Sequence, residues 1–126
     1  MRIVGIGVDV VEVDRVAALL ERRPTFRRRV FTREEVSYCE TKATPAGSYA
    51  ARWAAREACI KALGGIRNLK WQDIAVERAP TGAPRLALRG GARTRAERIG
   101  VAEVLVSFAH ERSTATAFCI AVGDHG

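Results

Sequence analysis

The spacing of apolar residues changes along the chain and predicts a strand followed by helices. Residues 3–11 form an aliphatic run that predicts a strand. Residues 12–23 then carry apolar positions at helical spacing until Pro24 ends the pattern. Thr32, followed three residues later by Glu35, has the capping-box pattern that opens a further short helix. The first third of the chain is therefore expected to be mainly helical behind a single strand.

A longer helix and further strands are predicted in the rest of the chain. The helix begins at Thr44, with Pro45 in its first turn, and runs to Leu63, where Gly64 and Gly65 stop it. Beyond it we expect strands over residues 73–78, 85–89, 101–109 and 115–122, a short basic helix over residues 91–99, turns over residues 80–84 and 110–113, and a tail over residues 124–126. This order predicts an α+β fold, and the length predicts a single domain over residues 1–126.

One carboxylate interrupts the first apolar strand. Asp9 lies in the run IVGIGVDVV, where an unpaired ionised carboxylate is unfavourable by several kcal/mol, so some group must compensate it. On the long helix, Trp53, Glu57 and Lys61 recur every four residues and share one stripe. This spacing favours either an ion pair between Glu57 and Lys61 or a two-carboxylate oxygen site for Mg²⁺ that joins Glu57 to Asp9. The spacing alone leaves both interpretations open.

Arginine dominates the positive charge of the chain. Its 18 arginines and 3 lysines outnumber the acidic residues and give a formal net charge of +7. Arginine binds phosphates and carboxylates through a planar fork, so we expect an acidic partner, with a compositional bias on a solvated surface as the alternative. A small basic nucleic-acid-binding domain would need aromatic residues among the basic ones, and only 6% of the residues are aromatic. We therefore expect no nucleic acid as a partner.

The cysteines and the apolar runs indicate the compartment. Cys39, Cys59 and Cys119 are odd in number and lack CxxC spacing, which argues against a disulfide framework or a zinc site and fits a reducing environment. No apolar run approaches the length of a membrane span, and the chain starts directly with the expected strand rather than with a signal region. We expect a cytoplasmic protein without a membrane partner.

Six blocks carry a specific resemblance, in the order GIGVDVVEVDRV, FTREEVSYCETK, RWAAREACIKALGG, WQDIAV, TGAP and VSFAH. Together they span nearly the whole chain and closely resemble the holo-acyl-carrier-protein synthases, the small trimeric class of 4'-phosphopantetheinyl transferases. The resemblance implies antiparallel strands packed on the long helix, and a homotrimer with active sites at the subunit interfaces. It also implies transfer of phosphopantetheine from coenzyme A to a serine of an acyl carrier protein, with release of 3',5'-ADP.

The resemblance assigns the catalytic centre to three residues. Asp9 and Glu57 correspond to the ligands of Mg²⁺, and Lys61 is expected to contact the same phosphates and stabilise the transition state. The serine proton could be taken by Glu57 or by a metal-bound water, and the sequence does not decide between them. A bound magnesium ion would also explain how a carboxylate is tolerated at Asp9.

The resemblance also assigns substrate contacts. Residues expected to contact coenzyme A are Lys61, the turn residues Gly64 and Gly65, Arg52 and Lys42 at the 3'-phosphate, the turn residues Thr81, Gly82 and Pro84, and His110. An ordinary helix C-cap and an ordinary hairpin turn would explain the two turns equally well. Arg15 and Arg22 are expected to face the acidic carrier, where charge complementarity speeds encounter. For the arginines at positions 27–29 we prefer a solvated face.

Two positions depart from the family pattern. Arg56 replaces a usual lysine, and Ala109 replaces a usual hydroxyl residue, so the affinity for coenzyme A is an open question. A catalytically inactive member kept as an interaction subunit is a further alternative, but it would lack Asp9, Glu57 or Lys61, and all three are present. The sequence leaves open whether the carrier belongs to fatty-acid synthesis, to a polyketide pathway or to both.

Overall fold

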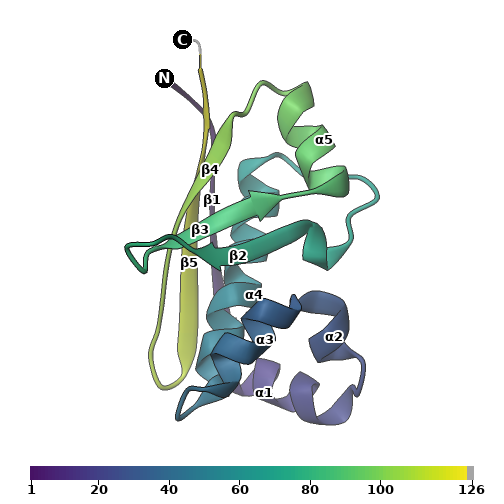
Figure 1. Ribbon diagram of the computed structural model, residues 1–126, viewed down its shortest axis with the longest axis vertical. Helices are drawn as coiled ribbons and strands as arrows, with labels where there is room; N and C mark the ends of the chain where they lie inside the picture. The colour runs from purple at the N-terminus through teal and green to yellow at the C-terminus, as the bar shows by residue number, and fades with distance from the viewer. Residues whose placement is uncertain (125–126) are drawn as a thin grey trace.

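The computed structural model describes residues 1–124, and residues 125–126 of the expected tail lie outside the described residues. Its elements are β1 (Arg2–Glu12), α1 (Val13–Arg22), α2 (Phe26–Val30), α3 (Arg33–Glu40), α4 (Pro45–Ala62), the 3-10 turn η1 (Trp71–Asp73), β2 (Ile74–Arg78), β3 (Pro84–Leu88), α5 (Gly90–Arg98), β4 (Glu103–His110) and β5 (Thr114–Gly123) (Figure 1). The predicted α+β fold is confirmed. Within residues 1–124, no helix combines the length and the apolar character needed to cross a bilayer.

The predicted elements are found with small shifts at their ends, and α2 and η1 are additions that the sequence pattern did not predict. The capping box is confirmed, because the Thr32 N–H donates to Glu35 Oε1 at 2.8 Å and the Glu35 N–H donates to Thr32 Oγ1 at 3.2 Å. The five-residue helix α2 is not predicted by the pattern, since it is too short to show a helical period. Asp73 does not begin a strand as expected. It ends η1, where its carboxylate accepts hydrogen bonds from the backbone N–H groups of Lys70 and Gly91.

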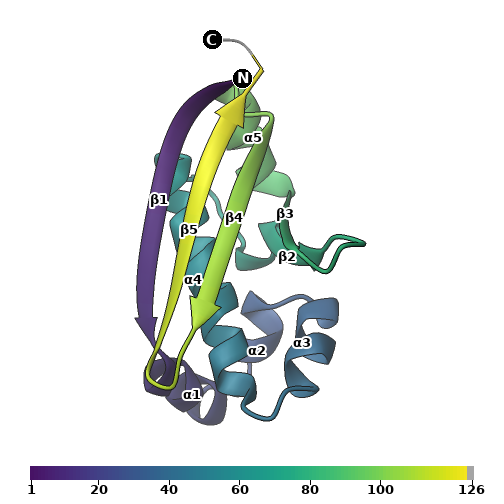
Figure 2. The ribbon, with the colours of Figure 1, turned by 90° about the vertical axis from the view of Figure 1, so that its left-hand side faces the viewer.

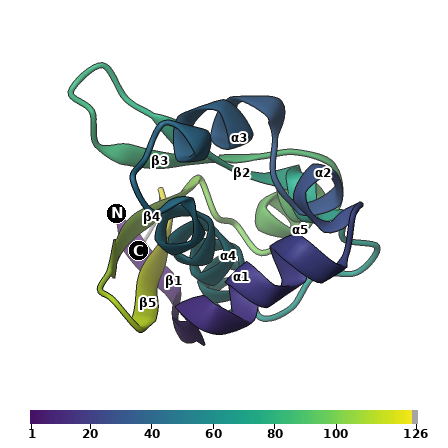
Figure 3. The ribbon, with the colours of Figure 1, turned by 90° about the horizontal axis from the view of Figure 1, so that it is seen from below.

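The three longest strands form one antiparallel sheet in the order β1-β5-β4, and β2 and β3 form a separate hairpin. β1 and β4 are therefore the two edges of the main sheet. Helix α4 crosses the inner face of this sheet, α2 and α3 lie beyond α4 on the side away from the sheet, and α1 continues from the lower end of β1 and packs beside α4 (Figures 1 and 3). Figure 2 looks onto the outer face of the sheet, which no helix covers.

Small residues bring β1 and α4 into close contact. A Cβ atom on Gly5 or Gly7 would overlap the carbonyl oxygen of Ala62 or Ala58, so larger side chains would push the strand away from the helix. The inward side chains of β5 are small as well, namely Ala115, Ala117, Cys119 and Ala121, and all are buried. Because side chains alternate along a strand, Asp9 shares the inner face with Gly7. The close contact therefore holds the Asp9 carboxylate beside α4.

A buried ion pair joins α3 to α4. The Arg56 guanidinium, which is fully buried, donates to both oxygens of Glu35, at 2.9 Å from Nη1 and 2.5 Å from Nη2. Its Nε donates to the Trp71 carbonyl at 3.1 Å, and Glu35 also accepts from the Val76 N–H at 3.2 Å. Such bidentate pairing requires the planar fork of arginine. Arg56, which replaces the family's usual lysine, thus has its hydrogen-bond donors paired with groups in the protein interior.

The outer face of the sheet is exposed and apolar. Its outward side chains include Ile6, Val8 and Val10 on β1, Leu105 on β4 and Phe118 on β5. Val10 is 62% exposed and Phe118 is 43% exposed. Apolar residues gathered on neighbouring strands in this way are typical of a protein–protein interface.

Candidate functional site

Asp9 and Lys61 meet where β1 passes the C-terminal half of α4. The Asp9 side chain is only 14% exposed, and Lys61 Nζ lies 3.2 Å from its Oδ1. Nζ also donates to the Val8 carbonyl oxygen at 3.0 Å. Among residues 1–124 no ion pair joins Lys61 to Glu57, because the lysine side chain extends toward β1. Lys61 thus places a positive charge directly beside Asp9.

Glu57 lies one helical turn before Lys61 and is close to the same carboxylate. Burial raises the pKa of Glu57 above its ordinary value and the negative charge of Asp9 raises it further, whereas Lys61 and Arg15 lower it. The two carboxylates therefore repel each other in a partly buried environment. A cation bound between them would reduce both this repulsion and the unfavourable free energy of burying the charge on Glu57.

The donor set fits a hard cation. Asp9 and Glu57 offer carboxylate oxygens, and Mg²⁺ typically takes one or two protein carboxylates and fills its remaining positions with water and phosphate oxygens. In the part of the chain that the structure describes, no group of three or more His, Cys, Asp or Glu side chains is placed to hold a metal. A site built by this chain would therefore rest on the two carboxylates and on oxygens from a ligand.

A basic cavity of about 460 Å³ lies at the N-terminal end of α4. Its lining brings together Lys42, Arg52 and His110, three residues that the resemblance assigns to one substrate. It also includes Tyr38 from α3 and Arg78 from β2. Lys42, Arg52 and Arg78 form no ion pair with a carboxylate of residues 1–124. The cavity therefore has the charge of an anion-binding site.

Arg52 gives the clearest sign of a missing anion. Its side chain is buried, with only 3% of the residue exposed, and its Nη1 donates to the Ser48 carbonyl at 3.1 Å. Its Nε has no hydrogen-bond partner among the described residues. A buried guanidinium without a counter-ion is unfavourable, so an anion bound in the cavity would be stabilised by this residue.

His110 reaches the cavity because of a glycine on the neighbouring helix. It ends β4 with its ring over Gly47 of α4, and a Cβ atom at Gly47 would come within 2.5 Å of His110 Nδ1. Any larger residue at position 47 would displace the imidazole. Ala109, the second departure from the family pattern, precedes His110 and is exposed.

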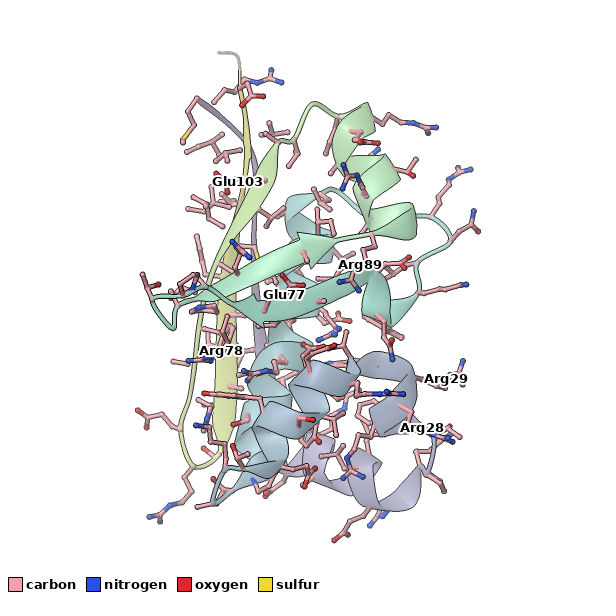
Figure 4. All side chains as sticks on the ribbon, viewed as in Figure 1. Arg28, Arg29, Glu77, Arg78, Arg89 and Glu103 are labelled. Atoms are coloured by element: carbon pink, nitrogen blue, oxygen red, sulfur yellow. The ribbon has the colours of Figure 1, made fainter. Side chains whose placement is uncertain are left out.

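Sequence reasoning missed Tyr38 and Arg78. Lys42 Nζ and Arg78 Cζ each lie 4.4 Å from the centroid of the Tyr38 ring, and Arg52 Cζ lies 4.7 Å from it. A hydrogen bond from Lys42, followed by the charges of Arg78, Lys42 and Arg52, lowers the pKa of the Tyr38 phenol against a smaller opposing effect of burial. Figure 4 shows Arg78 at the edge of the β2-β3 hairpin that faces α3. Tyr38 and Arg78 are 40 positions apart in the sequence. Their contact therefore cannot be predicted from the spacing of residues within one helix or strand.

The turn that the resemblance places near the nucleotide is the tip of this same hairpin. Gly82 has a φ of +89°, and the Ala83 N–H donates to Thr81 Oγ1 at 3.4 Å. Pro84 is the strand partner of Arg78, so the tip begins directly beyond the basic cavity. The internal contacts of the tip are those of an ordinary hairpin turn and do not by themselves indicate a ligand. Only the position of the tip, next to the basic cavity, supports a contact with a ligand.

Gly64 and Gly65 end α4 with φ values of +72° and +97°, a conformation that favours glycine. The Gly65 N–H donates to the Ile60 carbonyl at 2.9 Å, as in an ordinary helix C-cap. Next to them is a second cavity of about 630 Å³ whose lining includes Arg67, Arg95 and Arg98. The glycine turn therefore lies at the C-terminal end of α4, whereas the basic cavity lies at its N-terminal end.

The carboxylate cluster and the basic cavity lie on opposite sides of α4. At the spacing of an ideal helix, Glu57 and Arg52 are about 140° apart around the axis. Asp9 lies on the edge strand β1 and His110 on the opposite edge strand β4, with β5 between them (Figure 2). Within one chain, the carboxylate cluster and the basic cavity therefore do not face a common ligand-binding site.

A groove between α1, α2 and α4 leads toward the carboxylates. It has a volume of about 360 Å³, and its lining includes Phe26, Trp53, Arg23 and Arg29. Trp53 shares its stripe of α4 with Glu57, one helical turn away. An apolar floor with a basic rim would suit a partner helix that carries apolar and acidic residues.

The arginines assigned to the carrier lie beside this groove. Arg15 is on α1, close enough to Glu57 to lower its pKa, and Arg22 is exposed in the last turn of α1. Arg28 and Arg29 project from α2 on the side of the molecule away from the sheet (Figure 4). Positive charge thus continues from the neighbourhood of Glu57 along α1 and α2.

The comparisons with known proteins agree with this geometry. The sequence is 45% identical over 125 residues to a holo-[acyl-carrier-protein] synthase of Anaeromyxobacter dehalogenans (strain 2CP-C), covering 96% of this chain and 97% of that protein. The fold is similar to a crystal structure of the holo-ACP-synthase from Plasmodium yoelii, with a TM-score of 0.86, 29% identity and coverage of 98% of both chains. It is also similar to the Helicobacter pylori holo-[acyl-carrier-protein] synthase in complex with coenzyme A, with a TM-score of 0.79, 28% identity and coverage of 93% of this chain and 99% of that chain. Residues 5–120 match the family described as the 4'-phosphopantetheinyl transferase superfamily, and the chain belongs to it.

Proposed function

We propose that this chain transfers 4'-phosphopantetheine from coenzyme A to a serine of an apo acyl carrier protein, giving the holo carrier and 3',5'-ADP. The observation that carries this function is the meeting of Asp9, Glu57 and Lys61 on one side of α4. The names of the relatives support the carrier as acceptor, and the Helicobacter pylori complex supports coenzyme A as donor.

The carboxylates of Asp9 and Glu57 would hold Mg²⁺. Burial, and after it the negative charge of Asp9, raises the pKa of Glu57, and a bound cation would offset both causes. When bound, the ion would neutralise charge on the diphosphate of coenzyme A. The two carboxylates fix the position of that charge relative to α4 and β1.

Lys61 would stabilise the transferred phosphate. Its side chain is 54% exposed, and its ammonium is within reach of any anion that approaches Asp9. Negative charge shifts onto the leaving phosphate during transfer, so a contact from Lys61 becomes stronger in the transition state. The serine proton has Glu57 and a water as candidate acceptors.

A second copy of the chain would complete the site. Coenzyme A needs both the phosphate-binding cavity near Arg52 and the carboxylates near Lys61, and these lie on opposite sides of α4. The exposed apolar face of the sheet provides a contact surface between copies. A contact that places the β1 edge of one copy near the β4 edge of the next would be head-to-tail, and it generates a ring when its rotation closes. We propose the homotrimer that the family resemblance implies.

The carrier would dock on α1 and α2. Arg15 and Arg22 give this surface its charge, and the groove beside Trp53 gives it an apolar floor that leads to Glu57. The acceptor serine would then approach the carboxylates from the α1 side.

A reducing compartment such as the cytoplasm suits the chain. Cys39, Cys59 and Cys119 are free and buried, and burial raises the pKa of Cys39 to about 11 and that of Cys119 to about 12. Thiols of this kind are packing groups rather than reactive or paired ones.

The other classes of function have less support. Of the exposed large apolar side chains in residues 1–124, only Phe118 is aromatic, so the outer sheet face offers no row of stacking platforms for nucleic-acid bases. An inactive interaction subunit would need no converging Asp9, Glu57 and Lys61, whereas here Lys61 pairs with Asp9 and both residues influence the pKa of Glu57.

Intact-mass spectrometry tests the proposal directly. An apo carrier is incubated with the protein, coenzyme A and Mg²⁺, alongside a sample that contains EDTA. A gain of one phosphopantetheine that EDTA abolishes is expected. The absence of any gain with both fatty-acid and polyketide carriers would contradict the proposal and favour the interaction subunit.

A further inference from the structure

The basic cavity contains more positive charge than this chain neutralises. Lys42, Arg52 and Arg78 come from three separate segments and form no ion pair with a carboxylate of residues 1–124. Like charges held this close repel each other, so some group must keep them together before a ligand arrives. That group is the ring of Tyr38, which lies between 4.4 and 4.7 Å from all three cations.

An aromatic ring attracts cations through its negative faces while it adds no net charge. A carboxylate in the same place would neutralise the cations and compete with an anionic ligand. The ring instead leaves their charge available and fixes their positions, which lowers the cost of ordering them when the ligand binds.

Arg78 extends the cavity toward the hairpin tip. It is the strand partner of Pro84, so one ligand can contact Arg78 and the tip residues Thr81 and Gly82 together. The cation–π contact between Arg78 and Tyr38 links this end of the hairpin to α3. The hairpin and the helices are thus held at a fixed separation around the cavity.

We propose that Tyr38 and Arg78 are specificity-determining residues, and that they make transfer depend on a phosphomonoester at the 3' position of the nucleotide. This inference rests on the proposed function, with coenzyme A as donor. A phosphomonoester carries about two negative charges and three terminal oxygens, which suit several cations at once. A donor without the 3'-phosphate would leave Arg52 buried and unpaired.

The test compares nucleotides that differ only in that phosphate. Binding of adenosine 3',5'-bisphosphate and of AMP is measured by calorimetry on the full-length protein, and transfer is measured with coenzyme A and with 3'-dephospho-coenzyme A. The variants are Tyr38→Leu, which removes the ring, Tyr38→Phe, which keeps it, and Arg78→Gln. Arg85→Gln is the matched control, because Arg85 is exposed on the same hairpin and pairs with Glu77 outside the cavity.

Tyr38→Leu and Arg78→Gln are expected to weaken binding of the bisphosphate about fivefold or more and to change binding of AMP less than about twofold. Tyr38→Phe and Arg85→Gln should stay within about twofold of the wild type for both nucleotides. Equal losses for both nucleotides, or a similar loss in Arg85→Gln, would overturn the inference. A loss in Tyr38→Phe as large as in Tyr38→Leu would overturn the role of the ring. Arg78→Gln keeps the test decisive if Tyr38→Leu unfolds.

The inference and the proposed function fail in different ways. If the wild type transfers phosphopantetheine from coenzyme A but the variants keep full discrimination against the 3'-dephospho donor, the inference is wrong and the function stands. If the wild type transfers nothing, the function is wrong, and the binding data on the two nucleotides still decide the role of Tyr38 and Arg78.

Discussion

Lys61 on α4 pairs with Asp9 on β1, with Nζ 3.2 Å from Oδ1, across 52 positions of sequence. Its helical neighbour Glu57 is left to carry a raised pKa beside the same carboxylate. The pairing depends on Gly5 and Gly7, which allow the strand to approach the helix. The same ammonium can leave Asp9 for a phosphate, so the arrangement is suited to a ligand that brings its own negative charge.

Removing either carboxylate should abolish transfer without unfolding the protein. Asp9→Asn and Glu57→Gln keep the side-chain shape and remove one negative charge each. We expect kcat/KM to fall about a hundredfold or more, because the ligands of the proposed metal and the neighbours of the transferred phosphate are lost. The measurement is the rate of holo-carrier formation at saturating Mg²⁺.

Glu77→Gln is the matched control for these variants. Glu77 is an exposed carboxylate on β2 that pairs with Arg85 and Arg89, and Figure 4 shows it on the hairpin together with Arg89. Its loss should leave transfer near the wild-type rate. Near-normal turnover in Asp9→Asn or Glu57→Gln would show that the carboxylates are not the catalytic centre.

The raised pKa of Glu57 predicts how stability depends on pH. A carboxyl group with a higher pKa in the folded than in the unfolded state binds protons more readily when folded. Its stabilising effect is present below its ordinary pKa and is lost as the pH rises through the raised value. At about pH 7, Glu57→Gln should therefore be more stable than the wild type, and the difference should shrink toward about pH 4.

Urea unfolding at the two pH values, with and without MgCl₂, measures this effect. Added Mg²⁺ should stabilise the wild type at neutral pH and leave Glu57→Gln nearly unchanged, because only the wild type offers both carboxylates. A wild type that is as stable as Glu57→Gln at neutral pH without metal would show that the repulsion from Asp9 and the effect of burial are too small to matter.

Reversing charge on α1 should separate docking from chemistry. Arg22→Glu should raise the KM for the carrier protein and leave the KM for coenzyme A nearly unchanged, because Arg22 is exposed on α1 and does not line the basic cavity. Arg15→Glu should raise the carrier KM and also move the acid limb of kcat to higher pH, because Arg15 normally lowers the pKa of Glu57.

Steady-state kinetics over a range of pH distinguish the two variants. Arg93→Glu, on α5 and outside the cavity beside Gly64 and Gly65, makes the same charge change away from α1 and serves as the control. If Arg22→Glu raised both KM values equally, the docking surface would lie elsewhere. Identical pH profiles for Arg15→Glu and the wild type would contradict the influence of Arg15 on Glu57.

Local signals in the sequence were enough for most of the fold. The capping box at Thr32 and the proline at position 45 fix the starts of α3 and α4 through backbone preferences that act over a few residues. The strand β2 was placed one residue too early, because Asp73 binds backbone N–H groups in η1 rather than continuing the strand. This interaction cannot be predicted from neighbouring residues, because one of the N–H groups belongs to Gly91, which is distant from Asp73 in the sequence.

The site could be predicted only in part, for a related reason. Asp9 was conspicuous as a charge on an apolar strand, and Glu57 and Lys61 were conspicuous by their spacing. Tyr38 and Arg78 gave no signal, because their contact depends on how the hairpin packs against α3. Arg56 was considered as a departure that bears on coenzyme A, whereas its fork is occupied by Glu35 in the interior.

Sharing of the site between copies makes a strong prediction about mixtures. Lys61→Ala disables the carboxylate side of α4, and Arg52→Ala disables the phosphate-binding side. Each variant should be inactive alone, since every site then lacks one half. If a site takes one half from each of two copies, mixed rings contain some sites in which both halves are intact, so mixing should restore part of the activity.

The mixing experiment needs dissociation and reassembly of the two variants, followed by the holo-carrier assay. Val10→Glu on the exposed face of β1 is the companion variant, because a buried charge at a subunit contact should leave single chains of 13.7 kDa that are folded and inactive. Their mass is read by sedimentation and their fold by circular dichroism. Full activity in such single chains would show that one copy holds a complete site. No recovery in the mixture, despite mixed rings confirmed by native mass spectrometry, would lead to the same conclusion, because it would place Arg52 and Lys61 in the same site of one chain.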